Sequence, residues 1–160
     1  MNTKHTITIL LALATFASAG TSKPATQPKI LKTLNDFFCI VPANLQPGPH
    51  GEWTKLKQEA CNDKLAENKN KTAEMRVTIA DVGAITNDQI QVTTIVPKVG
   101  NIEVGLYLYF DSSVKDELAG LKRGDTITIR GICKRCDFPR ASKVYIDLKL
   151  CELVTETAKN

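Results

Sequence analysis

The chain has 160 residues, of which 42% are hydrophobic and 24% are charged, and its formal net charge is +4. That length suits one domain with a single hydrophobic core. The excess of 21 Lys and Arg over 17 Asp and Glu is too small to indicate a nucleic-acid-binding protein by itself. The chain contains no H-E-x-x-H, G-x-S-x-G or P-loop motif, which excludes the enzyme classes that those motifs define.

The first 19 residues have the pattern of a secretory signal peptide. A polar start with Lys4 precedes an apolar run of 13 residues over 7–19, which ends in Ala17-Ser18-Ala19. This run is too short for a membrane anchor, because a bilayer core needs roughly 20 apolar residues. No cysteine follows Ala19, so the residue that bacterial lipoproteins acylate is missing. We expect cleavage after Ala19 and an exported protein, periplasmic or extracellular, with no membrane span after removal of the signal.

Residues 20–51 form a Pro- and Gly-rich N-terminal segment, in which a short stretch around Leu34, Phe37 and Phe38 is apolar enough to pack. One amphipathic helix follows at 52–68, and we expect its apolar face to pack on the rest of the domain. Its apolar face is predicted to hold Trp53, Leu56, Ala60, Cys61 and Leu65, and its solvated face Lys55, Gln58, Glu59, Asp63 and Lys64.

From residue 73 to 155 the hydrophobic pattern has a period of two, which is typical of half-buried strands. One short helix interrupts it, with Ser112 or Ser113 as the N-cap and Leu118 on its apolar face. The predicted strands are 75–82, 89–96, 102–110, 126–130 and 144–150, and the helix is 112–121. This order, β-β-β-α-β-β, predicts an all-β protein with accessory helices, a five-stranded OB (oligonucleotide/oligosaccharide-binding) barrel. An open α+β sheet is the alternative that the same pattern permits.

Two motifs occupy the second half of the chain. Residues 118–133 contain L-x-x-L-x-x-G-D and a strand that ends in G-x-C, and residues 146–154 contain C-x-L-V. These stretches resemble the tRNA_anti-like family of bacterial OB-fold domains, whose members look like secreted proteins or lipoproteins. The resemblance implies an OB fold and export, and it names no ligand. Family members often carry a further cysteine on the third strand, where this chain has Leu108 and Tyr109.

The residues of these motifs have structural roles in their own right. Gly124 can adopt a positive φ and end the helix, Asp125 can bond turn amides, and Gly131 lets its strand bend. The residues predicted to point into the barrel are Ile127, Ile129, Ile146 and Leu148.

The chain has five cysteines, and export would place them where disulfides persist. They are Cys39, Cys61, Cys133, Cys136 and Cys151. The C-x-x-C at 133–136 fits a redox dithiol, half of a metal site completed by Cys151 and His50, or structural disulfides. We favour disulfides, because a strand precedes the motif and no helix follows it. A hairpin loop at 134–143 would put Cys133 opposite about Val144 and out of reach of Cys151, so bonds from Cys39 or Cys61 to the barrel are expected instead.

Catalysis is not indicated. After signal removal His50 is the single histidine, and it stands in a Pro/Gly-rich turn. Acid pairs such as Asp116-Glu117 fit an exposed helix surface. We therefore expect no enzyme activity, no metal and no cofactor.

A ligand-binding surface is the remaining hypothesis. Tyr107 and Tyr109 point outward from the third strand and could form a stacking platform. The loop expected after the fourth strand carries cations around an aromatic ring. From Leu121 to Lys149 there are eight cations and three acids, a net charge of +5. The predicted binding residues are Tyr107, Tyr109, Lys134, Arg135, Phe138, Arg140 and Lys143.

Two classes of function stay open at this point. One is an exported binding module for an unidentified polyanion, either nucleic acid or an acidic saccharide. The other is an envelope protein-interaction or structural module that uses the barrel only as a scaffold. Salt-dependent retention on heparin or single-stranded DNA separates them.

Overall fold

The structure is a computed structural model that describes residues 29–47, 53–86, 88–95, 97–140 and 142–154. In chain order its elements are α1 (Leu34–Phe38), η1 (Ala43–Leu45), α2 (Lys55–Ala66), β1 (Thr72–Thr86), β2 (Gln89–Thr94), β3 (Lys98–Val99), β4 (Ile102–Asp111), η2 (Ser112–Val114), α3 (Lys115–Ala119), β5 (Thr126–Arg140) and β6 (Lys143–Leu153). The signal peptide predicted at 1–19 and His50 lie outside the described residues. Within those ranges, no helix has the length and apolar character to cross a membrane.

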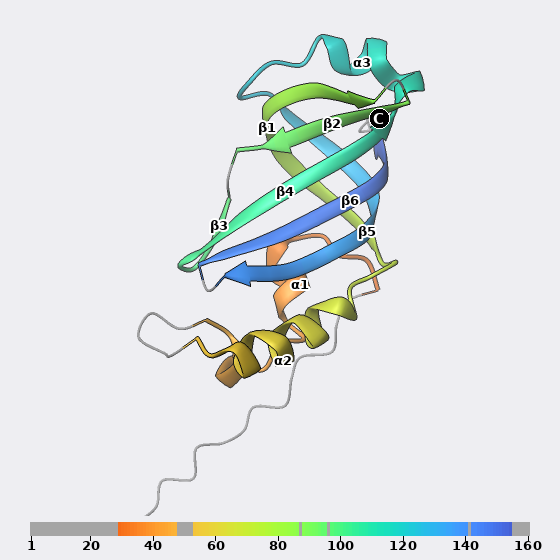
Figure 1. The fold of residues 1–160 in the computed structure, drawn as a ribbon. Coiled ribbons are helices and arrows are strands. Elements are labelled where there is room, and N and C mark those ends of the chain that lie inside the picture. Colours follow the sequence, from red (N-terminus) through yellow and green to blue (C-terminus); the bar gives the residue numbers. More distant parts are fainter. Residues whose placement is uncertain (1–28, 48–52, 87, 96, 141, 155–160) are drawn as a thin grey trace, which may run out of the picture.

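Five long strands close into a barrel (Figure 1). Around the ring β1 pairs with β2, β2 with β4, β4 with β6, β6 with β5, and β5 with β1. The β4–β6 pair is parallel and the other four are antiparallel. This ring, with α3 between its third and fourth long strands, is the OB barrel. The predicted fold is confirmed, and the open-sheet alternative is wrong because β1 has a partner strand on each side.

The core follows the alternation of the strands. Ile129, Ile146 and Leu148 have no exposed surface, as predicted from their positions. Ile127 packs against the core but is only partly buried. At the N-terminal end of the described chain, Phe37 and Phe38 of α1 are buried as well, so the short apolar stretch docks as predicted.

The buried face of α2 agrees with the predicted one at Cys61 and Leu65 and differs from it at Leu56. Thr54 caps the helix by accepting a hydrogen bond from the backbone N–H of Lys57 at 3.2 Å. Leu56, which was expected to pack, is 78% exposed. The buried positions are Cys61 and Leu65. Leu56 lies outside because Gln58 and Asn62 face the barrel and bond directly to β5.

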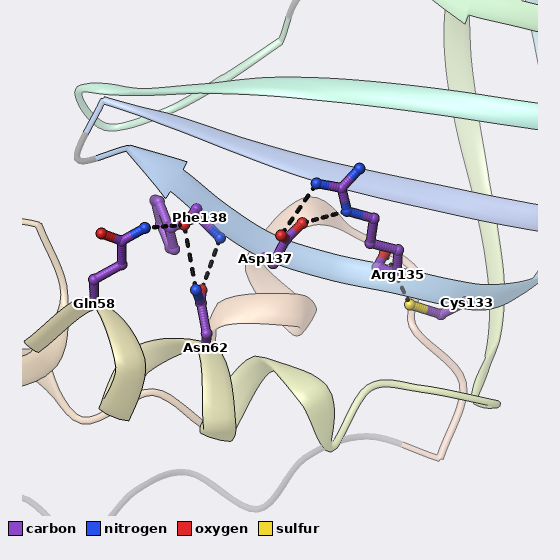
Figure 2. A network of polar contacts seen from close by, with 6 residues as sticks. All are labelled: Gln58, Asn62, Cys133, Arg135, Asp137 and Phe138. Carbon is purple, nitrogen blue, oxygen red and sulfur yellow. Dashed lines mark hydrogen bonds and ion pairs between the residues drawn. The ribbon is translucent and has the colours of Figure 1, made fainter. Parts of the chain in front are cut away.

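That polar contact joins α2 to β5 (Figure 2). Asn62 accepts a hydrogen bond from the Phe138 N–H at 2.8 Å and donates one to the Phe138 carbonyl at 3.2 Å. Gln58, placed on the solvated face by the sequence pattern, donates to the same carbonyl at 2.7 Å. These bonds satisfy backbone groups of a strand that would otherwise be desolvated by the helix. They therefore set how α2 is rotated on the barrel.

The helix predicted at 112–121 is shorter and is split in two. A 3-10 turn, η2, precedes α3, and the side chain of Asp111 accepts a hydrogen bond from the N–H of Ser113 at 2.9 Å. Asp111 is thus the cap that was assigned to Ser112 or Ser113. Leu118 is buried, as expected for the apolar face.

The largest correction concerns β5, which was expected to end before a loop at 134–143. The strand instead runs to Arg140, and Cys133 lies opposite Leu148 rather than Val144. The ladder shifts register between Cys133 and Arg135. This bulge adds an extra residue, Lys134, so that Cys133 and Cys136 are both buried. A bulge breaks the period of two, and the charged stretch therefore resembled a loop.

Candidate ligand-binding face

The outward side of β4 carries two of the predicted binding residues. Tyr107 and Tyr109 are half-buried and alternate with the buried Leu106 and Leu108. Gln91 on β2 donates a hydrogen bond to the Tyr109 hydroxyl at 3.2 Å. In Figure 1, β4 and β6 cross the front of the barrel while α1 and α2 lie at its lower end. The two rings therefore belong to a face of the sheet that the helices leave open.

A third ring, Tyr145 on β6, completes this face. Its centroid lies 5.8 Å from that of Tyr107 in an edge-to-face contact. Gly105 is its parallel partner on β4, and a Cβ at Gly105 would come within 2.7 Å of Tyr145 Cδ1. The missing side chain thus makes room for the ring. Tyr145 was not among the predicted residues, because only the β4–β6 pairing brings it beside Tyr107.

Cations lie over these rings. The Arg135 guanidinium is 5.3 Å and Lys143 Nζ is 5.2 Å from the Tyr145 centroid. Lys149 Nζ lies 5.5 Å from the Tyr109 centroid. These distances are those of cation–π contacts. We call this group the tyrosine face: Tyr107, Tyr109, Tyr145, Arg135, Lys143 and Lys149.

Two carboxylates partly neutralise the positive charge of the tyrosine face. Asp137 accepts hydrogen bonds from Arg135 at 2.6 and 3.1 Å (Figure 2). Asp147 lies opposite both Arg135 and Tyr107 in the ladders. Burial raises the pKa of Asp147, although Arg135 acts in the opposite direction. In the described part of the chain, Lys143 and Lys149 form no ion pair, so they are the cations available to a ligand.

Three other predicted residues do not join this face. Phe138 is 1% exposed, and its ring lies 5.5 Å from Trp53 and 6.0 Å from Phe38. It is a core residue under the N-terminal helices and cannot touch a ligand on the outer face. Lys134 and Arg140 are exposed on β5 rather than in a loop, and among the described residues neither contacts a ring of the tyrosine face.

All five cysteines are thiols in this structure, and four are buried. Asn68, buried in the same region, donates to the Phe37 carbonyl at 2.9 Å and also bonds to Cys136. Burial raises the pKa of Cys61 and of Cys133 to about 11, and that of Cys151 to about 12. The pKa of Cys136 is raised first by burial and then by the neighbouring Cys133. The predicted disulfide stays a prediction.

We expect the native thiols to react slowly, because the thiolate is the nucleophile and raised pKa values suppress it. In the reduced native protein at mildly alkaline pH, a thiol reagent such as DTNB should react quickly with no cysteine other than the half-buried Cys39. All five thiols should react after unfolding in urea. Two fast thiols in the folded protein would instead indicate a reactive dithiol at 133–136. Fewer than five after unfolding, in protein never exposed to reductant, would demonstrate a disulfide.

A metal site is not visible in the described residues, where no group of three His, Cys, Asp or Glu side chains could hold an ion. Cys133, Cys136 and Cys151 therefore do not assemble as the ligand set considered from the sequence. His50, its proposed fourth member, lies outside the described residues.

Comparison with known proteins gives similarities of fold. No family model and no curated protein matches the chain. A candidate nucleic acid-binding lipoprotein from Klebsiella pneumoniae is 18% identical, with 59% of this chain and 78% of that chain covered and a TM-score of 0.43. The Stn1–Ten1 complex of S. pombe is 13% identical (53% and 59% covered, TM-score 0.34). Asparaginyl-tRNA synthetase of Entamoeba histolytica is 11% identical (56% and 22% covered, TM-score 0.36).

This chain is an OB-fold protein. Its strand order and the closure of its barrel show this fold without support from the solved structures. The resemblance to the tRNA_anti-like family rests on the motifs at 118–133 and 146–154, where Gly124 has a φ of 95° as its turn requires.

Proposed function

We propose that this protein is an exported OB-fold binding module, not an enzyme, and that its tyrosine face binds a polyanion such as single-stranded nucleic acid or an acidic saccharide. The observation that carries the proposal is the row of three outward rings with cations over two of them. Outward-facing rings on a sheet, even half-buried ones, offer flat apolar surface to bases or sugars, and the adjacent cations offer charge to their anionic groups.

The electrostatic part of binding should be modest. Arg135 is engaged by Asp137, which leaves Lys143 and Lys149 as the free cations among the described residues of the face. Two phosphate contacts to a single strand correspond to a slope of log K against log salt of roughly −1.4. Stacking on the tyrosines should therefore supply the larger, salt-independent share of the affinity.

The direct test is binding to a thymidine oligonucleotide and to heparin at low and moderate salt. Replacing Tyr107 and Tyr145 by alanine should weaken binding at every salt concentration, by about 1–3 kcal/mol for each ring that stacks. Phenylalanine at the same positions keeps the ring and should retain most of the affinity. Arg123 is exposed between α3 and β5, outside the tyrosine face. An Arg123→Ala variant is therefore the control for loss of a positive charge elsewhere on the surface.

Wild-type protein that binds neither ligand at low salt would contradict the proposal, as would alanine variants that bind unchanged. The envelope interaction module would then be the better interpretation. Export is tested separately by measuring the mass of the N-terminal peptide of protein recovered from cells. The expected result is cleavage after Ala19.

Asp147→Asn should raise both polyanion affinity and stability at neutral pH. Burial raises the folded-state pKa of Asp147, so its ionisation disfavours the folded state, and that cost disappears as the pH falls through the folded pKa. The stability gap between variant and wild type should thus be widest at neutral pH and close below 3.8, the ordinary value. Urea unfolding at the two pH values and oligonucleotide binding at neutral pH measure these effects. Weaker binding in the variant would point to a ligand that donates hydrogen bonds to this carboxylate.

A further inference from the structure

The barrel has an open seam beside the first half of β1. β2 pairs with β1 only from Ile79 onward, whereas residues 72–78 pair with β5 on their other side. Among the described residues, two residues of the chain, Leu31 and Ile95, form backbone hydrogen bonds with β1 along the seam. Leu31 donates to the Thr72 carbonyl at 3.0 Å and accepts from the Glu74 N–H at 2.8 Å, and Ile95 donates to the Thr78 carbonyl at 2.9 Å.

Arg76 lies between these two contacts. In an antiparallel pair the backbone groups of alternate residues point to opposite edges of the strand. Those of Thr72, Glu74 and Thr78 point to the seam, so the N–H and C=O of Arg76 do too. In the described residues, nothing else in the chain forms a backbone hydrogen bond with them. The seam therefore presents a short stretch of unpaired strand edge.

A groove of about 580 Å³ runs along this edge. Its apolar surfaces include Met75, Val77 and Leu106, which belong to the barrel core. Thr33 and the start of α1 form one side, and Pro97 and the 41% exposed Ile95 form the other. A strand laid beside β1 would thus place alternate side chains over the core.

The charges around the groove have one sign. Lys32, Arg76 and Lys98 line it, and among the described residues no acidic side chain does. Among the described residues, none of these three cations forms an ion pair. Asp36, the acid nearest to Lys32 in the sequence, is occupied in capping α1, where it accepts from the Lys32 and Thr33 N–H groups.

We propose that this seam is a docking site for an extended acidic segment of a partner protein, which adds to the β1 edge as a short strand. Its backbone would pair with Arg76, its apolar side chains would lie over Met75 and Val77, and its carboxylates would face the three cations. Strand addition at an exposed edge is an established mode of peptide recognition. The site is separate from the tyrosine face and from any polyanion bound there.

The described chain on either side of Leu31 does not enter the groove edge at Arg76. Leu31 forms a parallel bridge with Ala73, so Lys29 and Ile30, the described residues before it, lead away from Arg76. After Leu31 the chain turns into α1 and forms the side of the groove. Within the part of the chain that the structure describes, the edge at Arg76 is therefore open to a second molecule.

The test uses the full chain and three synthetic peptides, with NMR hydrogen exchange as the readout. An alternating acetyl-(Glu-Val)4-amide peptide should bind and slow exchange of the Arg76 amide at least about tenfold. A fully N-methylated copy has the same side chains and charge but no N–H and a blocked edge. It should therefore neither bind nor slow exchange of the Arg76 amide. An acetyl-(Lys-Val)4-amide peptide should not bind either.

Variants then separate charge from strand pairing. Arg76→Glu should lower the affinity for the (Glu-Val)4 peptide at least about tenfold. Arg123→Glu, an equal charge change outside the groove, should change that affinity less than about twofold. Unchanged exchange at Arg76 with the Glu peptide saturating would overturn the proposal. Equal binding of the N-methylated peptide would also overturn it, because attraction by the cations alone would then account for the contact.

Discussion

Replacing Phe138 by alanine is expected to lower the free energy of unfolding by about 3–5 kcal/mol. The side chain is 1% exposed and lies between β5 and the N-terminal layer, where it contacts Trp53 and Phe38. Its removal leaves a cavity at the contact that holds the helices on the barrel. Urea unfolding followed by Trp53 fluorescence measures the loss, and Trp53 is the single tryptophan of the chain.

Leu56→Ala is the matched control for this variant. Leu56 is 78% exposed on α2, so its truncation should change the free energy of unfolding by less than about 0.5 kcal/mol. The opposite ranking of the two variants would mean that Leu56 lies inside, as the sequence pattern predicted, and that Phe138 does not. It would also return Phe138 to the candidate ligand-binding residues.

Gly131→Ala is expected to destabilise the fold by about 1–3 kcal/mol through overpacking. A Cβ at this position would lie 2.8 Å from Cys151 Sγ and 3.3 Å from Leu148 Cβ. The close approach of β5 to β6 here thus requires glycine, and the cysteine of the C-x-L-V motif fills the space that it leaves. Thermal or urea unfolding of the single variant measures the effect.

A double-mutant cycle identifies the cause. In a Cys151→Ala background the sulfur is gone, so the Gly131→Ala loss should shrink, with a coupling energy of about 0.5–3 kcal/mol. Gly120→Ala is the control, since a Cβ there would meet nothing within 4 Å. It should be neutral or stabilising by up to about 1 kcal/mol. Additive losses at Gly131 and Cys151 would show that the sulfur is not what excludes a side chain.

The sequence determined the fold class and most of the core, because these depend on local periodicity. Alternation of apolar and polar residues is a direct consequence of strand geometry, and it was sufficient to place Ile129, Ile146 and Leu148 inside. It was also sufficient to turn Tyr107 and Tyr109 outward. The order of the elements then left the OB barrel as the simplest closed arrangement.

Only the tertiary structure decided what meets on the outer face, and that α2 turns Gln58 rather than Leu56 toward the barrel. The parallel β4–β6 pairing, which joins residues about forty positions apart, brings Tyr145 over Gly105 and beside Tyr107. The bulge after Cys133 carries Phe138 into the core, where Asn62 and Gln58 bond to its backbone. Side-chain period cannot reveal either event, because strand register and the satisfaction of buried backbone groups are set between distant segments.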